Sequence, residues 1–173
     1  MKVLGLIVLF FCSSVFALDD YYKVKYAYSA VKTDFIEDQT NTFDNNTTTT
    51  RTSKSLKKNF IGLGYGFRND KDDRLEFSFL VEMSGDKTYL LDIEYKITRQ
   101  FGEGKPYFNI GLSNLIQDNS YESSALILGL GIINPLSKDL SVDFALDYKN
   151  HNIDEEDNDL EFTSFGASLN YKF

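Results

Sequence analysis

The sequence has no tryptophan, one cysteine, one histidine and two prolines in 173 residues. A single cysteine cannot form an intrachain disulfide, and Cys12 lies in a segment that we expect to be removed, so the mature chain would have no thiol chemistry. One histidine, His151, is a poor basis for a nucleophile activated through a proton relay. Scarce proline, combined with 15 Phe and 11 Tyr, favours strands over helices.

A surplus of positive charge is also missing. The chain has 18 Lys and Arg against 26 Asp and Glu, which gives a formal net charge of −8. Without a basic excess to neutralise phosphates, this composition argues against a nucleic-acid-binding protein. The mean hydropathy is −0.29. That value excludes a bundle of membrane-spanning helices but is compatible with a membrane β-barrel, whose strands are half polar.

The first residues have the organisation of a secretory signal peptide. Lys2 precedes a short apolar run, and Val15 and Ala17 stand at the −3 and −1 positions of a cleavage site. The apolar run is too short to cross a membrane as a helix. We therefore predict a signal peptide over residues 1–17. A lipoprotein signal ending at Cys12 is the alternative, but it needs a small residue directly before the cysteine, where the sequence has phenylalanine.

The rest of the chain, residues 18–173, has a hydrophobic period of two, which is the period of a strand with one apolar face. Segments with this pattern recur eight times and are separated by polar stretches, so we predict one domain of eight antiparallel strands. The segments are 20–31, 59–68, 74–83, 88–99, 106–115, 124–134, 140–149 and 165–173.

The two faces of these segments indicate which one meets lipid. One face carries large apolar residues, as in Leu128 and Phe144, and the other carries glycines and charges of both signs. An eight-stranded barrel has a lumen just wide enough for side chains, and the large residues would crowd it. We therefore expect the large residues to face hydrocarbon, and glycine, serine and paired charges to fill the interior. Lipid also demands closure, because unpaired edge amides in hydrocarbon are costly. For these reasons we predict an up-and-down transmembrane β-barrel.

The connections alternate in length. The short ones, 69–73, 100–105 and 134–139, would all lie at one end of the barrel, and the longest ones, 32–58 and 149–159, at the other. Short periplasmic turns and longer external loops are the expected asymmetry of an outer-membrane barrel. Several tyrosines near strand ends are candidates for an aromatic girdle at the membrane interfaces. These are Tyr22, Tyr89, Tyr107, Tyr148 and Tyr171.

The last segment carries the sharpest signal. Apolar or aromatic residues alternate back from the final phenylalanine, at Phe173, Tyr171, Leu169, Ala167 and Phe165. Together with the signal peptide, this pattern resembles that of the bacterial outer-membrane β-barrel family. The length of the chain is similar to that of the small eight-stranded OmpA/OmpX-type, porin-like members. The resemblance implies that these five residues are the assembly signal that the barrel-assembly machinery recognises.

One stretch departs from the alternation, because Glu161 and Thr163 would fall on the lipid side. A bulge, or emergence of the strand above the membrane, would explain it.

Three features of the sequence are candidate sites of chemistry. Small lipid-A-modifying barrels need a histidine and a serine close together, but no serine lies at short sequence spacing from His151, which we interpret as an exposed loop residue. The acidic run at 154–159 lacks the spacing of a calcium loop, so we interpret it as a solvated loop. Basic residues in the Thr-rich stretch, such as Arg51 and Lys54, either touch lipopolysaccharide phosphates or lie in a disordered loop. We predict no catalytic residue, cofactor or metal ligand.

The sequence therefore favours a non-enzymatic integral protein of a Gram-negative outer membrane, which acts through its external loops 32–58 and 149–159 in structural or surface-interaction roles. The alternatives are a small channel for ions or solutes and, less favoured, a lipid-A-modifying enzyme. Expected partners are outer-membrane lipids, lipopolysaccharide and the barrel-assembly machinery, with no nucleic acid. We expect a monomer, and the sequence names no extracellular partner.

Overall fold

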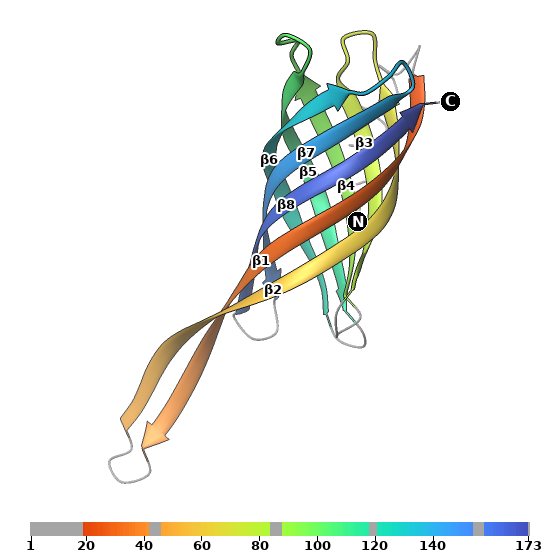
Figure 1. The fold of residues 1–173 in the computed structure, drawn as a ribbon. Helices are drawn as coiled ribbons and strands as arrows, with labels where there is room; N and C mark the ends of the chain where they lie inside the picture. Colours follow the sequence, from red (N-terminus) through yellow and green to blue (C-terminus); the bar gives the residue numbers. More distant parts are fainter. Residues whose placement is uncertain (1–18, 42–45, 84–87, 118–120, 154–157, 173) are drawn as a thin grey trace, which may run out of the picture.

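A computed structural model describes residues 19–41, 46–83, 88–117, 121–153 and 158–172. These residues form eight strands that close into one antiparallel barrel in sequence order (Figure 1). The strands are β1 (Asp19–Asn41), β2 (Asn46–Arg68), β3 (Arg74–Glu82), β4 (Thr88–Thr98), β5 (Lys105–Gln117), β6 (Tyr121–Pro135), β7 (Leu140–Ile153) and β8 (Asn158–Lys172). The predicted all-β, eight-stranded fold is confirmed. No helix long and apolar enough to cross a membrane occurs in these ranges.

The first and last strands close the barrel. β1 pairs with β8 from Tyr21↔Lys172 to Asp34↔Asp159, without a break in register. Every other strand pairs with its neighbours in the sequence. The predicted signal peptide and Phe173 lie outside the described residues.

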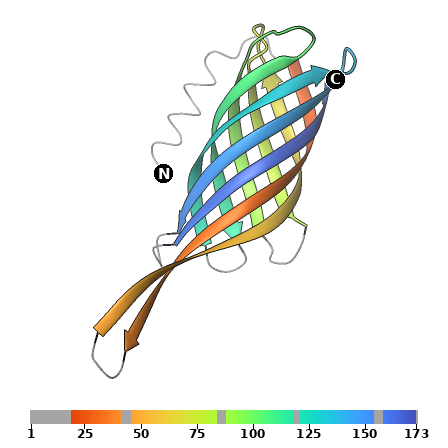
Figure 2. The same ribbon diagram turned by 60° about the vertical axis from the view of Figure 1, so that its left-hand side comes forward.

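The two ends of the barrel differ, as Figures 1 and 2 show. Three short connections, 69–73, 99–104 and 136–139, lie at one end, which we call the turn end. The long β1–β2 hairpin leaves the barrel wall at the opposite end, which we call the hairpin end. The first turn is held by Asn69, whose Oδ1 accepts the backbone N–H groups of Lys71 and Asp73, both at 2.9 Å.

The outer surface is apolar along every strand. Leu63, Leu128 and Leu130, for example, expose 68%, 39% and 60% of their surface although they lie in the middle of strands. Of the expected girdle tyrosines, Tyr22, Tyr148 and Tyr171 do lie exposed on this surface. The prediction for Tyr107 was wrong. This residue lies near the end of β5, but its parity places the ring in the lumen, where it is buried.

The β1–β2 hairpin corrects the prediction of a loop at 32–58. The two strands remain paired as far as Asn41↔Asn46, whereas β1 last pairs with β8 at Asp34↔Asp159 and β2 last pairs with β3 at Phe60↔Glu82 (Figure 1). Outside the bilayer a strand needs no apolar face, so the hydrophobic pattern stops while the strand continues. The threonines of this stretch are β-branched and favour extended backbone.

The second predicted loop is also shorter than expected. β7 continues to Ile153 and β8 begins at Asn158, so most of 149–159 is strand. The expected bulge near residue 162 is absent from the described ladders, because β8 keeps continuous register with β1 and β7. Thr163 does face outward, and Phe162 turns inward with 1% of its surface exposed. Of the two expected explanations the bulge is therefore not found in the described residues, and emergence of the strand above the membrane stays a prediction.

Candidate functional site

The lumen is the candidate functional site, and its inward-facing charges form the core of it. In the described part of the chain, four lysines and five carboxylates lie in the lumen with at most 3% of their surface exposed. They are Lys23, Lys25, Lys96, Lys149, Glu76, Asp92, Glu94, Asp143 and Asp147. Each lysine lies within ion-pair distance of at least one carboxylate. Charges removed from water are tolerated when they are paired and hydrogen-bonded, as here.

The half of this network nearer the turn end is centred on Lys96. Its Nζ contacts Asp143 and lies 3.0 Å from Glu76 Oε2, and Lys23 contacts Glu76 as well. Two tyrosine hydroxyl groups also donate hydrogen bonds to these carboxylates. Tyr21 donates to Glu76 at 2.6 Å, and Tyr107 donates to Asp143 at 2.7 Å. These bonds connect β1, β3, β4, β5 and β7 across the lumen.

The next layer toward the hairpin end is centred on Lys25. Its Nζ lies 2.9 Å from Glu94 and 3.5 Å from Asp147. Asn109 donates through Nδ2 to the same two carboxylates, at 2.8 and 3.0 Å. One step further toward the hairpin end, Lys149 pairs with Asp92 at 2.6 Å. The network therefore crosses the lumen in consecutive layers.

Glycines on the inner face make room for the large members of the network. A Cβ on Gly131 would lie 2.4 Å from atoms of the Tyr107 ring, and a Cβ on Gly66 would lie 2.3 Å from Tyr21. Real Cβ atoms do not approach other atoms so closely, and a packed interior has no slack to absorb the overlap. Gly66 and Gly131 thus make room for the two tyrosines.

An apolar cluster closes the lumen toward the hairpin end. Its buried members come from six strands and leave at most 4% of their surface exposed. They are Ala27, Val31, Phe60, Leu80, Leu90, Leu115 and Phe162. Ionic layers and this apolar cluster together occupy the interior, which confirms the expectation that lumen charges pair with one another. Paired charges and packed apolar side chains of this kind can hold the strands rigidly.

His151 corrects a further prediction. It was expected to be an exposed loop residue, but it lies on β7, faces the lumen and has 0% of its surface exposed. Its Nδ1 lies 3.1 Å from Ser123 Oγ, and its ring meets the edge of Phe162 at 5.4 Å between centroids. The serine was missed because it is 28 residues away in sequence. The β6–β7 register, in which the numbers of paired residues add up to 276, makes the two residues diagonal neighbours when it is continued beyond its last pair, Ile127↔Lys149.

This pair does not form a lipid-facing catalytic site. Both side chains are buried inside the barrel, whereas an enzyme acting on lipid A needs its nucleophile and base open to the membrane. His151 Nε2 has no hydrogen-bond partner among the described residues, so no carboxylate orients the ring. No group of three His, Cys, Asp or Glu residues placed to hold a metal ion occurs in the described ranges. The side chains of the acidic run 154–159 lie outside them.

The proposed assembly residues lie on the outward face of β8. Phe165, Leu169 and Tyr171 expose 54%, 46% and 54% of their surface, and Ala167 is half-buried between them. Phe173 lies outside the described residues. The outward parity is the one predicted, and it leaves these side chains free on the lipid-facing surface.

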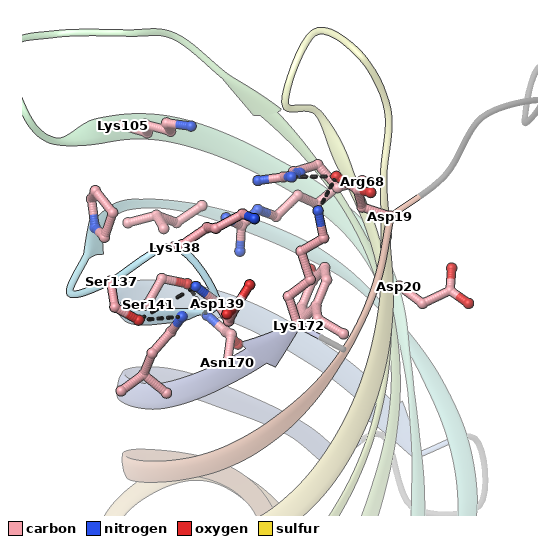
Figure 3. A pocket seen from close by; sticks show the side chains of 15 residues that line it. Asp19, Asp20, Arg68, Lys105, Ser137, Lys138, Asp139, Ser141, Asn170 and Lys172 are labelled. Atoms are coloured by element: carbon pink, nitrogen blue, oxygen red, sulfur yellow. Dashed lines mark hydrogen bonds and ion pairs between the residues drawn. The ribbon is translucent and has the colours of Figure 1, made fainter.

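A second polar group lies at the rim of the turn end, beyond the outward-facing Tyr22 and Tyr171. There Asp19 bonds to both Lys172, at 2.8 Å, and Arg68 (Figure 3). The hydrogen bonds from Lys172 and Arg68 lower the pKa of Asp19 to about 2. Asp19 is therefore ionised at neutral pH and holds the end of β8 against the first turn.

Comparison with known proteins shows which solved structures share this fold. No family model and no curated protein matches this sequence. Among solved structures, neisserial surface protein A (NspA) superposes with a TM-score of 0.62 at 14% identity, over 89% of this chain and 97% of that one. The outer-membrane protein OprG from Pseudomonas aeruginosa gives 0.57 at 11% identity, over 92% and 98%. The N-terminal β-barrel domain of OprF from the same organism gives 0.51 at 13% identity, over 90% and 100%. The likeness confirms, at the level of fold, the predicted resemblance to small outer-membrane barrels.

Proposed function

We propose that this chain is a non-enzymatic integral outer-membrane protein of a Gram-negative bacterium, in which a filled barrel anchors the projecting β1–β2 hairpin at the cell surface. The observation that carries the proposal is the continuation of this hairpin past both neighbouring strands while the lumen beneath it is closed. In this orientation the turn end faces the periplasm. The predicted signal peptide supports export, and the apolar outer surface supports residence in lipid.

The hairpin is the part suited to contact the surroundings. Lys54 and Lys57 on β2 are exposed, and basic side chains near the membrane rim can bind lipopolysaccharide phosphates. Outer-membrane lipids and lipopolysaccharide are therefore the proposed partners of the barrel and its rim. The barrel-assembly machinery is the proposed partner of the β8 residues. The chain is proposed to act as a monomer, and no role with nucleic acid is proposed.

Site-specific labelling tests the orientation. The proposed mature chain has no cysteine, so Ser53→Cys on the hairpin and Lys71→Cys in the first turn each create a single thiol. In intact cells, a membrane-impermeant maleimide should label Ser53→Cys and leave Lys71→Cys unlabelled until the outer membrane is permeabilised. The reverse pattern would show that the hairpin points into the periplasm and would overturn the proposal.

Conductance measurements distinguish a filled barrel that acts as a membrane anchor from the alternative of a small channel. We expect no steady conductance from the purified barrel in planar bilayers, because the apolar cluster and the ionic layers occupy the lumen. Steady single-channel currents would instead establish a pore. The enzymatic alternative has its own test, since mass spectrometry of lipid A from an overexpressing strain should show no change.

A further inference from the structure

A small pocket opens at the turn end of the barrel, inside its rim (Figure 3). It has a volume of about 60 Å³. Its lining comes from the turn 136–139 and from the turn-end parts of β1, β2, β3, β5, β6, β7 and β8. Five of its lining side chains are cationic and three are carboxylates. The cations are Arg68, Arg74, Lys105, Lys138 and Lys172, and the carboxylates are Asp19, Asp20 and Asp139.

The carboxylates do not cancel this charge where a ligand would lie. Asp20 points away from the pocket in Figure 3, and its Oδ2 accepts a hydrogen bond from the outward-facing Tyr65 at 2.7 Å. Asp19 is shared by Arg68 and Lys172. Asp72, which does not line the pocket, lies 3.4 Å from Arg68 and 2.6 Å from Lys105 Nζ, so these three cations meet two carboxylates. Asp139 is the remaining acid at the mouth. Lys138, beside it in the same turn, forms no ion pair with a described residue.

Arg74 is the member of the pocket that points most clearly to a ligand. It is a cation with only 5% of its surface exposed, and its guanidinium stacks over the Tyr21 ring at 5.0 Å. Its Nε has no hydrogen-bond partner, and no carboxylate of the described residues lies within ion-pair distance of it. Buried polar atoms are nearly always hydrogen-bonded, and an unpartnered donor on a charged group is costly.

The pocket ends on a closed floor. Tyr21 lies beneath Arg74 and donates to Glu76, which is in turn held by Lys23 and Lys96. A solute that enters from the turn end can therefore reach Arg74 but has no open path past the ionic layers. The geometry is that of a shallow cup with a closed floor.

We propose that this cup binds a compact phosphate group, on the periplasmic side if the orientation proposed above holds, with Arg74 donating to it from the lumen side and Lys138 from the rim. An anion of this kind supplies the acceptor that Arg74 Nε lacks. Arginine offers a planar fork of donors that matches phosphate oxygens, and a dianion makes better use of several converging cations than a single carboxylate does. The small volume limits the buried part of the ligand to the phosphate itself.

Titration of the full barrel in a nonionic, phosphate-free detergent tests this proposal. Inorganic phosphate, followed by ³¹P NMR and by the ¹⁵N–¹H signals of arginine Nε groups, should saturate one site and shift the Arg74 signal. Arg74→Gln should weaken binding at least tenfold. Arg99→Gln is the matched control, because its side chain lies at the same end, 76% exposed, and does not line the pocket. Lys138→Gln, an exposed turn substitution that leaves the network intact, should weaken binding several-fold.

Heat-modifiable migration on a cold gel shows whether Arg74→Gln still folds, and Lys138→Gln keeps the test valid if it does not. Absence of saturable phosphate binding, equal loss in Arg99→Gln, or equally tight binding of acetate would overturn the proposal. Glycerol 1-phosphate separates the possible sources: binding as tight as that of phosphate supports a lipid headgroup or sugar phosphate, and weaker binding supports free phosphate.

Discussion

Gly131 on β6 lies directly beneath the ring of Tyr107 on β5, so that a Cβ at this position would come within 2.4 Å of the phenol and 2.3 Å of the Phe144 carbonyl oxygen. Gly131→Ala should therefore destabilise the barrel by about 1–3 kcal/mol, as overpacking does. Urea titration of the refolded protein measures this. Gly166→Ala is the control, because its Cβ would meet nothing closer than 3.5 Å. Equal stability of the two variants would contradict the packing described here.

Lys96→Met tests the ionic layers. Removing Lys96 leaves buried Asp143 and Glu76 short of a counter-charge, so we expect a loss of about 3–5 kcal/mol in the free energy of unfolding. Lys32→Met provides the comparison, since its side chain is 50% exposed and lies 4.0 Å from Glu161. We expect less than about 1 kcal/mol there. A small effect at Lys96 in the same titration would mean that the network is open to water.

Leu128→Arg tests which face meets lipid. Leu128 lies outward in the middle of β6, so an arginine there should cost about 2–4 kcal/mol in a lipid refolding titration. Leu136, in the last turn, is 60% exposed at the end of the barrel. Leu136→Arg should cost about 0–1 kcal/mol, because it lies at the interface. If both variants refold like the wild type, the outer surface is not in hydrocarbon.

His151→Ala tests the buried histidine. The substitution leaves a gap beside Phe162 and removes the hydrogen-bond partner of Ser123, so we expect a loss of about 1–3 kcal/mol. Asn152→Ala, at the next and exposed position, should be close to neutral. The lipid A of cells carrying either variant should be unchanged. A stable His151→Ala protein would restore the interpretation of His151 as a solvated loop residue.

Deletion of Phe173 tests the proposed assembly signal. If the machinery reads the alternate residues of β8 from this terminus, the deletion should lower the amount of folded protein in the outer membrane. Quantitative immunoblotting of unboiled and boiled membranes measures it. Phe101→Ala removes an aromatic ring that is 80% exposed in a turn at the end of the barrel where β8 finishes, and this variant should assemble normally. Normal assembly without Phe173 would show that the signal lies elsewhere.

The sequence predicts the two faces of the barrel well. Side-chain direction alternates with a period of two, so a single register decision places Leu128 outward and Lys25 inward along a whole strand. The same alternation places Tyr107 in the lumen. Its position near a strand end suggested the girdle, but the parity along the strand decides where the ring points. The extended hairpin was missed because hydrophobic alternation reports contact with lipid, and a paired strand outside the bilayer has none.

The partners within the lumen were beyond prediction from sequence. Lys25 and Asp147 are 122 residues apart, and whether they meet depends on the stagger of strands around the cylinder. A sequence pattern fixes which charges enter the lumen but not which layer each occupies. Arg74 belongs to the same class: its parity was predictable, whereas its lack of a hydrogen-bond partner at Nε follows only from the positions of its neighbours.

The pairing of β1 with β8 has a consequence for biogenesis. Tyr21 and Lys172 meet at this seam, and they are among the first and last residues of the described chain to be synthesised. Bringing such distant segments together carries a large loop-closure entropy, and it has to wait until the last strand is present. Until then β1 and β7 would both offer unsatisfied amides to hydrocarbon, which is prohibitively costly. Insertion into the bilayer and completion of the wall must therefore be one concerted event, or else the two open margins must be shielded until the final strand arrives.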